Sequence, residues 1–122
     1  MGYMRERRKI PRRHILFYSR VFDRQTGIFL GYLGDMTEAG MMLISEKPLA
    51  VGKVFHLRID LPDESYTRPA LNFDARSAWS EKDIDPNFYN TGFEFVGISD
   101  ETRQIVSQVI DDYGFRDDEF LE

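Results

Sequence analysis

The chain has 122 residues, a mass of 14.3 kDa, no cysteine and a formal net charge of −5. This length fits one domain with its own core, and a hydrophobic content of 42% argues against a disordered chain. The absence of cysteine excludes disulfides and thiolate chemistry, and it suits a reducing compartment. No apolar run approaches the roughly 18 residues that span a bilayer. The charged N-terminus also lacks the apolar core of a signal peptide, so we expect a cytoplasmic protein without membrane insertion.

The charge is unevenly distributed, because one run near the N-terminus is strongly basic. Arg5 to Arg13 hold six basic residues and one acidic residue, a charge of +5, so the other 113 residues sum to −10. Charge runs are commonly solvated tails, and a tail folded back onto the acidic body is a second interpretation. A third is that the run has an anionic partner which the body does not share.

Two arginines within this run favour a ligand. Arg8 and Arg12 are four residues apart, and Pro11 between them biases Ile10 toward an extended backbone, which disfavours a helix. The planar fork of arginine bonds a phosphate bidentately and can also stack on a base. Arg7 flanks the pair, and we expect a smaller contribution from it.

We expect a flexible basic arm over residues 1–13 and a folded domain over residues 14–122. After the arm, six segments have the composition or the alternating pattern of strands, and turn residues separate them. They are residues 14–22, 28–34, 41–44, 54–61, 71–80 and 91–96. In the fourth segment, alternation assigns four residues to the core: Phe55, Leu57, Ile59 and Leu61. Short strands at this spacing favour a small antiparallel barrel over a parallel βαβ arrangement.

Near the end of the chain the apolar pattern changes to the period of a helix. One stripe holds Ile105, Val106, Val109, Ile110 and Tyr113. Ser99 or Asp100 can cap the start, and Gly114 can end the helix. A helix this short is marginal alone, so we expect it to dock over an open end of the barrel. The tail, residues 115–122, has four acidic residues and two phenylalanines, which fit either a frayed end or a partner-binding segment.

A second motif lies between two of the apolar segments. Asp35, Thr37 and Gly40 offer a carboxylate, a hydroxyl and a glycine within six residues. A plain turn accounts for them, because Asp and Thr cap backbone donors and Gly adopts positive φ. Together with the arginine pair, the motif favours a ligand-binding site over a plain turn. A carboxylate suits the adjacent N1–H and 2-amino donors of guanine, and arginine suits its O6/N7 edge and the phosphate.

The order and spacing of these motifs resemble the PilZ domain family, the bacterial receptors for cyclic di-GMP. The family's Arg-x-x-x-Arg motif matches Arg8 to Arg12. Its Asp/Asn-x-Ser-x-x-Gly motif matches Asp35 to Gly40, with Thr37 in place of serine. Two further stretches resemble the family's last two barrel strands: Ala78-Trp79 and Gly92-Phe93-Glu94-Phe95. The resemblance covers essentially the whole chain.

This resemblance implies an all-β fold, a six-stranded antiparallel β-barrel with a C-terminal helix, and no catalysis or cofactor. The residues expected to bind cyclic di-GMP are Arg7, Arg8, Arg12, Asp35, Thr37 and Gly40. The implied role is an adaptor that passes the second-messenger signal to another protein, an unidentified bacterial protein of signalling, motility or biofilm formation. From the +5 charge of the arm beside the −10 body, we expect the arm to become ordered on ligand binding.

Other chemistry has little support in the sequence. His14 and His56 lack a Cys, Asp or second His at the spacing of a metal site, and no catalytic triad or phosphate loop stands out. Met36, Met41 and Met42 suit either the core or an adaptable surface beside a ligand. A barrel that binds single-stranded nucleic acid is one alternative, although a body of −10 would repel a polyanion. A PilZ adaptor that binds only protein is another, and the intact motifs weigh against it.

Overall fold

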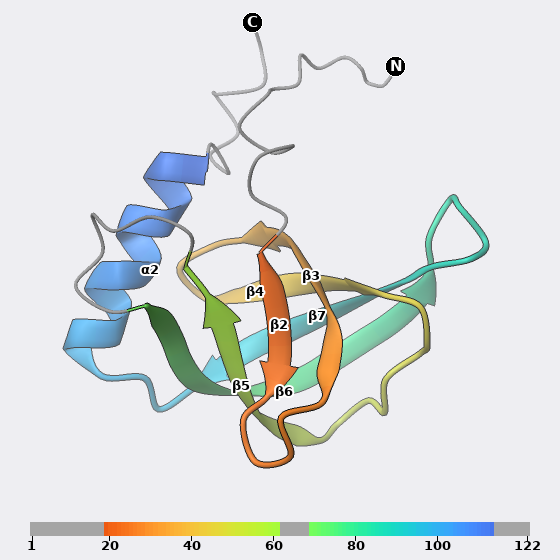
Figure 1. Cartoon of the computed structure of the whole chain (residues 1–122), viewed down its shortest axis with the longest axis horizontal. Helices are drawn as coiled ribbons and strands as arrows, with labels where there is room; N and C mark the ends of the chain where they lie inside the picture. The colour runs from red at the N-terminus through yellow and green to blue at the C-terminus, as the bar shows by residue number, and fades with distance from the viewer. Residues whose placement is uncertain (1–18, 62–68, 114–122) are drawn as a thin grey trace, which may run out of the picture.

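The structure is a computed structural model, and it describes residues 19–61 and 69–113. These residues form a closed antiparallel barrel and one α-helix (Figure 1). The elements in chain order are β2 (Arg20–Asp23), β3 (Phe29–Met36), β4 (Gly40–Ser45), β5 (Val54–Asp60), β6 (Ala70–Lys82), β7 (Tyr89–Val96) and α2 (Asp100–Tyr113). Around the barrel the order is β2-β3-β4-β7-β6-β5. The predicted six-stranded barrel with a C-terminal helix is confirmed. The predicted arm, its boundary with the domain and the acidic tail lie outside the described residues.

The barrel interior is filled by alternate side chains of its strands. On β5 the predicted core face is confirmed, since four side chains are buried: Phe55, Leu57, Ile59 and Leu61. Each large apolar side chain that is fully buried contributes roughly 1.5–3 kcal/mol. Met36 and Met41 are also in the core, whereas Met42 is only partly buried and points outward.

Helix α2 shares this core. The buried residues of its stripe are Ile105, Val106, Val109 and Ile110, and β6 is the strand against which the helix packs. Figure 1 shows α2 beside the beginning of β6. Of the two predicted caps, Ser99 is the one that caps the helix, because its Oγ accepts the N–H of Thr102 at 3.1 Å. The predicted packing of the helix against the barrel is confirmed by this shared core. The side chain of Tyr113 and all of Gly114 lie outside the described residues.

Two hairpins are longer than the sequence predicts. Strands β3 and β4 extend into the second motif and leave only residues 37–39 between them. The β6–β7 hairpin gains two residues on each strand, because Glu81 and Lys82 pair with Asn90 and Tyr89. Glu81, Lys82 and Asn90 have low strand propensity, which the hydrogen bonds of the ladder outweigh. In Figure 1 this hairpin projects from the barrel on the side away from α2. Within the described ranges, no helix has the length and apolar character needed to cross a bilayer.

Candidate ligand-binding site

A register shift in β3 turns one motif side chain outward. Leu33 is buried, so strict alternation would also direct Asp35 into the core. The shift at Gly34 instead leaves Asp35 exposed and places Met36 inside. Such bulges re-aim side chains, and this one presents a carboxylate on the outer face of the barrel.

A second register shift has the same effect on β6. Ser77 is fully buried, and alternation would place Trp79 inside as well. The shift at Ala78 leaves Trp79 facing outward with 41% of its surface exposed. Its indole covers Gly92 of β7, where a Cβ atom would overlap the ring. The position of the indole therefore depends on the missing side chain of Gly92.

The strand register brings these side chains into one row. Asp35 pairs with Met42 of β4, Met42 pairs with Gly92, and Gly92 pairs with Trp79. Neighbouring strands are about 4.8 Å apart, so the path from Asp35 to Trp79 along the curved surface of the barrel is about 14 Å. The row forms part of an open pocket of about 310 Å³. A carboxylate at one end and an aromatic plate at the other suit a ligand that carries a planar base.

The turn of the second motif forms another wall of this pocket. Thr37 Oγ1 accepts the N–H groups of Ala39 at 3.2 Å and Gly40 at 3.3 Å. The N–H of Thr37 donates to the carbonyl of Gly40 at 2.8 Å. Gly40 is so close to β7 that a Cβ atom would overlap the carbonyl oxygen of Phe93. Asp35, Thr37 and Gly40 thus line one pocket, and the threonine hydroxyl holds the turn. Their binding of a ligand stays a prediction.

Two carboxylates lie in the pocket. Asp35 Oδ1 accepts the N–H of Met36 at 2.8 Å, so this oxygen braces the end of β3. Glu94 of β7 is exposed, lines the same pocket and pairs in register with Gly40. Neither Glu94 nor Trp79 was singled out from the sequence as a site residue. Their place depends on pairing between strands that are far apart in sequence, and no local pattern carries that information.

The predicted basic side of the site is not part of the described structure. Arg7, Arg8 and Arg12 all lie outside the described residues. Their contribution to the pocket therefore stays a prediction from the sequence.

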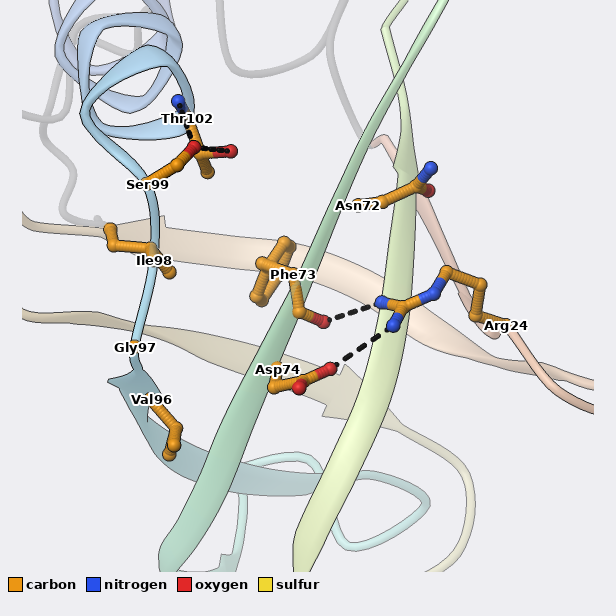
Figure 2. Close-up of a pocket in the computed structure, with 9 residues that line it drawn as sticks. All are labelled: Arg24, Asn72, Phe73, Asp74, Val96, Gly97, Ile98, Ser99 and Thr102. Carbon is orange, nitrogen blue, oxygen red and sulfur yellow. Dashed lines mark hydrogen bonds and ion pairs between the residues drawn. The ribbon is translucent and has the colours of Figure 1, made fainter.

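A second pocket, of about 270 Å³, lies where β6 parts from β7 and the chain enters α2 (Figure 2). The guanidinium of Arg24 donates to the carbonyls of Leu57 at 3.1 Å and Phe73 at 2.9 Å, and to the carboxylate of Asp74 at 3.1 Å. His56 Nδ1 lies 2.8 Å from the same carboxylate. The hydrogen bond from His56, followed by that from Arg24, lowers the pKa of Asp74. These polar groups satisfy one another, and no motif residue lines this pocket.

No partner for His56 was predicted from the sequence, and in the structure Asp74 of the neighbouring strand lies beside it. This pair does not extend to a metal site. In the part of the chain that the structure describes, no group of three or more His, Cys, Asp or Glu side chains is placed to hold a metal ion.

Comparison with known proteins adds a family and two solved folds. The family model of the PilZ domain matches residues 6–112. The inhibitor of motility MotI/DgrA of Bacillus subtilis is 20% identical with a TM-score of 0.61, and the match covers 74% of this chain and 43% of that one. The PilZ domain of YcgR from Escherichia coli, solved with c-di-GMP, is 18% identical with a TM-score of 0.59, over 79% of this chain and 82% of that one.

At sequence identities of 20% and 18%, the similarity to these two structures establishes a shared fold and nothing further. This chain spans less than half the length of MotI/DgrA. Among curated proteins, no sequence matches this one.

Proposed function

The chain belongs to the PilZ domain family, and from that premise we propose that it is a receptor and adaptor for cyclic di-GMP. The observation that carries this proposal is a single open pocket that gathers Asp35, Thr37 and Gly40 beside the exposed indole of Trp79. The solved YcgR domain, which contains c-di-GMP, supports the choice of ligand. A cytoplasmic location is part of the proposal.

Each group in the proposed site has a distinct role. The ligand carries two phosphates and two guanine bases, so it needs cations, acceptors and aromatic surface. Arg8 and Arg12 would bond the phosphates and stack on a base, with a smaller contribution from Arg7. Asp35 would accept guanine donors, and Trp79 would stack on a base.

The turn and its glycine have supporting roles in this proposal. Thr37 holds the turn through its hydroxyl, and it keeps the hydrogen-bonding group of the family's serine. Gly40 lets β4 lie close against the backbone of Phe93 on β7, which holds the turn of the motif beside the pocket.

The ligand would also join the arm to the barrel. The basic run has a charge of +5 and the rest of the chain −10, but attraction between exposed charges is screened over about 10 Å in salt. Ordering the nine-residue run costs roughly 1–2 kcal/mol for each residue. Contacts to the ligand would offset this cost. A ligand shifts such an equilibrium only through its greater affinity for the ordered state.

The ordered arm would form the surface that a partner protein recognises. The partner would be a bacterial protein of signalling, motility or biofilm formation. The description of MotI/DgrA as an inhibitor of motility supports motility within this range. The chain would thus act without catalysis, by presenting or hiding a surface.

Titration calorimetry with the full chain tests the proposed function. Three probes are compared: cyclic di-GMP, GTP and a short single-stranded oligonucleotide. We expect saturable binding of cyclic di-GMP only. Binding of the oligonucleotide alone would instead indicate a nucleic-acid-binding barrel, and no binding of any probe would indicate an adaptor that recognises only protein.

A further inference from the structure

We propose that Glu94 determines specificity for guanine in this pocket. Its carboxylate accepts hydrogen bonds from the N1–H and 2-amino groups of a guanine base that stacks on Trp79. The inference rests on the proposed function and adds the residue that reads the base.

The placement of Glu94 relative to the indole supports this role. Glu94 follows Gly92 by two residues on β7, so both face the same side, about 7 Å apart along the strand. The indole of Trp79 covers Gly92, which makes the aromatic plate and the carboxylate neighbours. The residue opposite Glu94 on β4 is Gly40, which packs against the backbone of Phe93 and adds no side chain beside Glu94. A base stacked on the indole would therefore direct an edge toward Glu94.

The carboxylate of Glu94 has no other interaction partner among the described residues. Arg76 of β6 is its cross-strand neighbour, yet across residues 19–61 and 69–113 Glu94 forms no ion pair and no side-chain hydrogen bond. By contrast, Asp35 uses one oxygen to brace β3. Among the described residues, Glu94 is thus the pocket carboxylate with both oxygens available for an adjacent pair of donors.

Because Glu94 is charged, the direction in which ligand affinity changes on neutralising it tests its role. A carboxylate repels a ligand with two phosphates unless it meets hydrogen-bond donors. On guanine, N1–H and the 2-amino group form an adjacent donor pair, whereas adenine presents an acceptor at N1. If Glu94 faces the base, neutralising it weakens binding; if it faces a phosphate, neutralising it strengthens binding.

The experiment compares Glu94→Gln with the wild-type full chain by calorimetry. Glutamine keeps the size of the side chain and removes the charge, and thermal unfolding confirms that the variant is folded. The ligands are cyclic di-GMP and cyclic di-IMP, in which each guanine lacks its 2-amino group. We expect Glu94→Gln to bind cyclic di-GMP about tenfold more weakly. The wild-type preference for cyclic di-GMP over cyclic di-IMP should also shrink, because the two changes remove the same contact.

The matched control is Glu81→Gln, which neutralises an exposed carboxylate on the same hairpin outside the pocket. It should leave both affinities unchanged. Unchanged or increased affinity in Glu94→Gln overturns the inference, and so does an equal loss for the two ligands. In these outcomes the wild-type chain still binds cyclic di-GMP and the proposed function stands. A wild-type chain that does not bind it would refute both.

Discussion

Two glycines shape the ligand pocket, because a side chain at either position would occupy space already taken. At Gly92 a Cβ atom would overlap the indole of Trp79, and at Gly40 it would overlap the backbone of Phe93. The indole is a side chain and can move, whereas the second overlap requires β4 and β7 to separate. At these positions the absence of a side chain sets the shape of the site.

Arg8→Ala or Arg12→Ala should each weaken cyclic di-GMP binding at least tenfold. A hydrogen bond to a charged group contributes on the order of 1.5–3 kcal/mol, and lost stacking adds to this. Titration calorimetry at fixed ionic strength measures the change. Arg13→Ala is the matched control, and its smaller effect should fade as salt is raised. If both motif variants bind cyclic di-GMP as tightly as the wild type, the arm is not part of the binding site.

Thr37→Val should lower the free energy of unfolding by about 1 kcal/mol, because the hydroxyl that accepts two backbone N–H groups of the turn is lost. Thr37→Ser keeps the hydroxyl and should be close to the wild type in both stability and ligand affinity. Urea unfolding measures the first quantity, and calorimetry measures the second. A valine variant as stable as the wild type would show that the turn does not depend on this hydroxyl.

The pH dependence of stability should contain a contribution from Asp74, whose pKa is lowered from 3.8 by His56 and then Arg24. A carboxyl group with a lowered pKa in the folded state stabilises the protein above its unfolded pKa. That stability is lost as the pH falls through the folded value. Asp74→Asn should therefore be less stable than the wild type at pH 7, and the difference should shrink below about pH 4.

Urea unfolding at pH 7 and pH 3 measures this difference for Asp74→Asn. Because Asp74 is more than one-third exposed, solvent screening keeps the expected effect small. Glu81→Gln, which alters an exposed carboxylate elsewhere, is the control. A difference for Asp74→Asn that stays constant across this pH range would show that the pairing makes no contribution.

At the scale of elements, the site depends on two irregular strands. The alternation that places Leu57 of β5 in the core is local and can be read from the sequence, as can the stripe of α2. The outward direction of Asp35 and Trp79 cannot, because it follows from one extra residue in each strand. Whether a strand has such a bulge is decided by its pairing partners. The contact of His56 with Asp74 was missed for the same reason, since it joins neighbouring strands.

Gly92→Ala should displace the indole of Trp79 while the barrel stays folded. Trp79 is the chain's single tryptophan, so fluorescence reports on its position. We expect altered tryptophan emission and a weaker response to cyclic di-GMP, because the new methyl group takes the place of the ring. Gly34→Ala, which crowds Ile44 and Met42 instead, is the control for emission. Unaltered emission and ligand response in Gly92→Ala would contradict the described packing.

At the scale of the molecule, different elements form the pocket and complete the core. Strands β3, β4, β6 and β7 form the pocket, while β2, β5 and α2 complete the barrel and its core. The family and the barrel could be predicted from the sequence, because the motif, the strand patterns and the helix period are local. Of the barrel side of the candidate site, the sequence indicated Asp35, Thr37 and Gly40 but not Trp79 and Glu94. The joining of the arm to the barrel remains a prediction, since it depends on a ligand and on residues outside the description.

Hydrogen exchange of the full chain, with and without cyclic di-GMP, tests most directly whether arm and barrel close on one ligand. We expect exchange to slow across residues 5–13 and 35–40 together when cyclic di-GMP is added, because both segments would contact the same molecule. GTP at the same concentration is the control and should leave both segments unchanged. An arm already protected without ligand would contradict the switch and leave a rigid binding site. No slowing in either segment at saturating cyclic di-GMP would contradict the binding site itself.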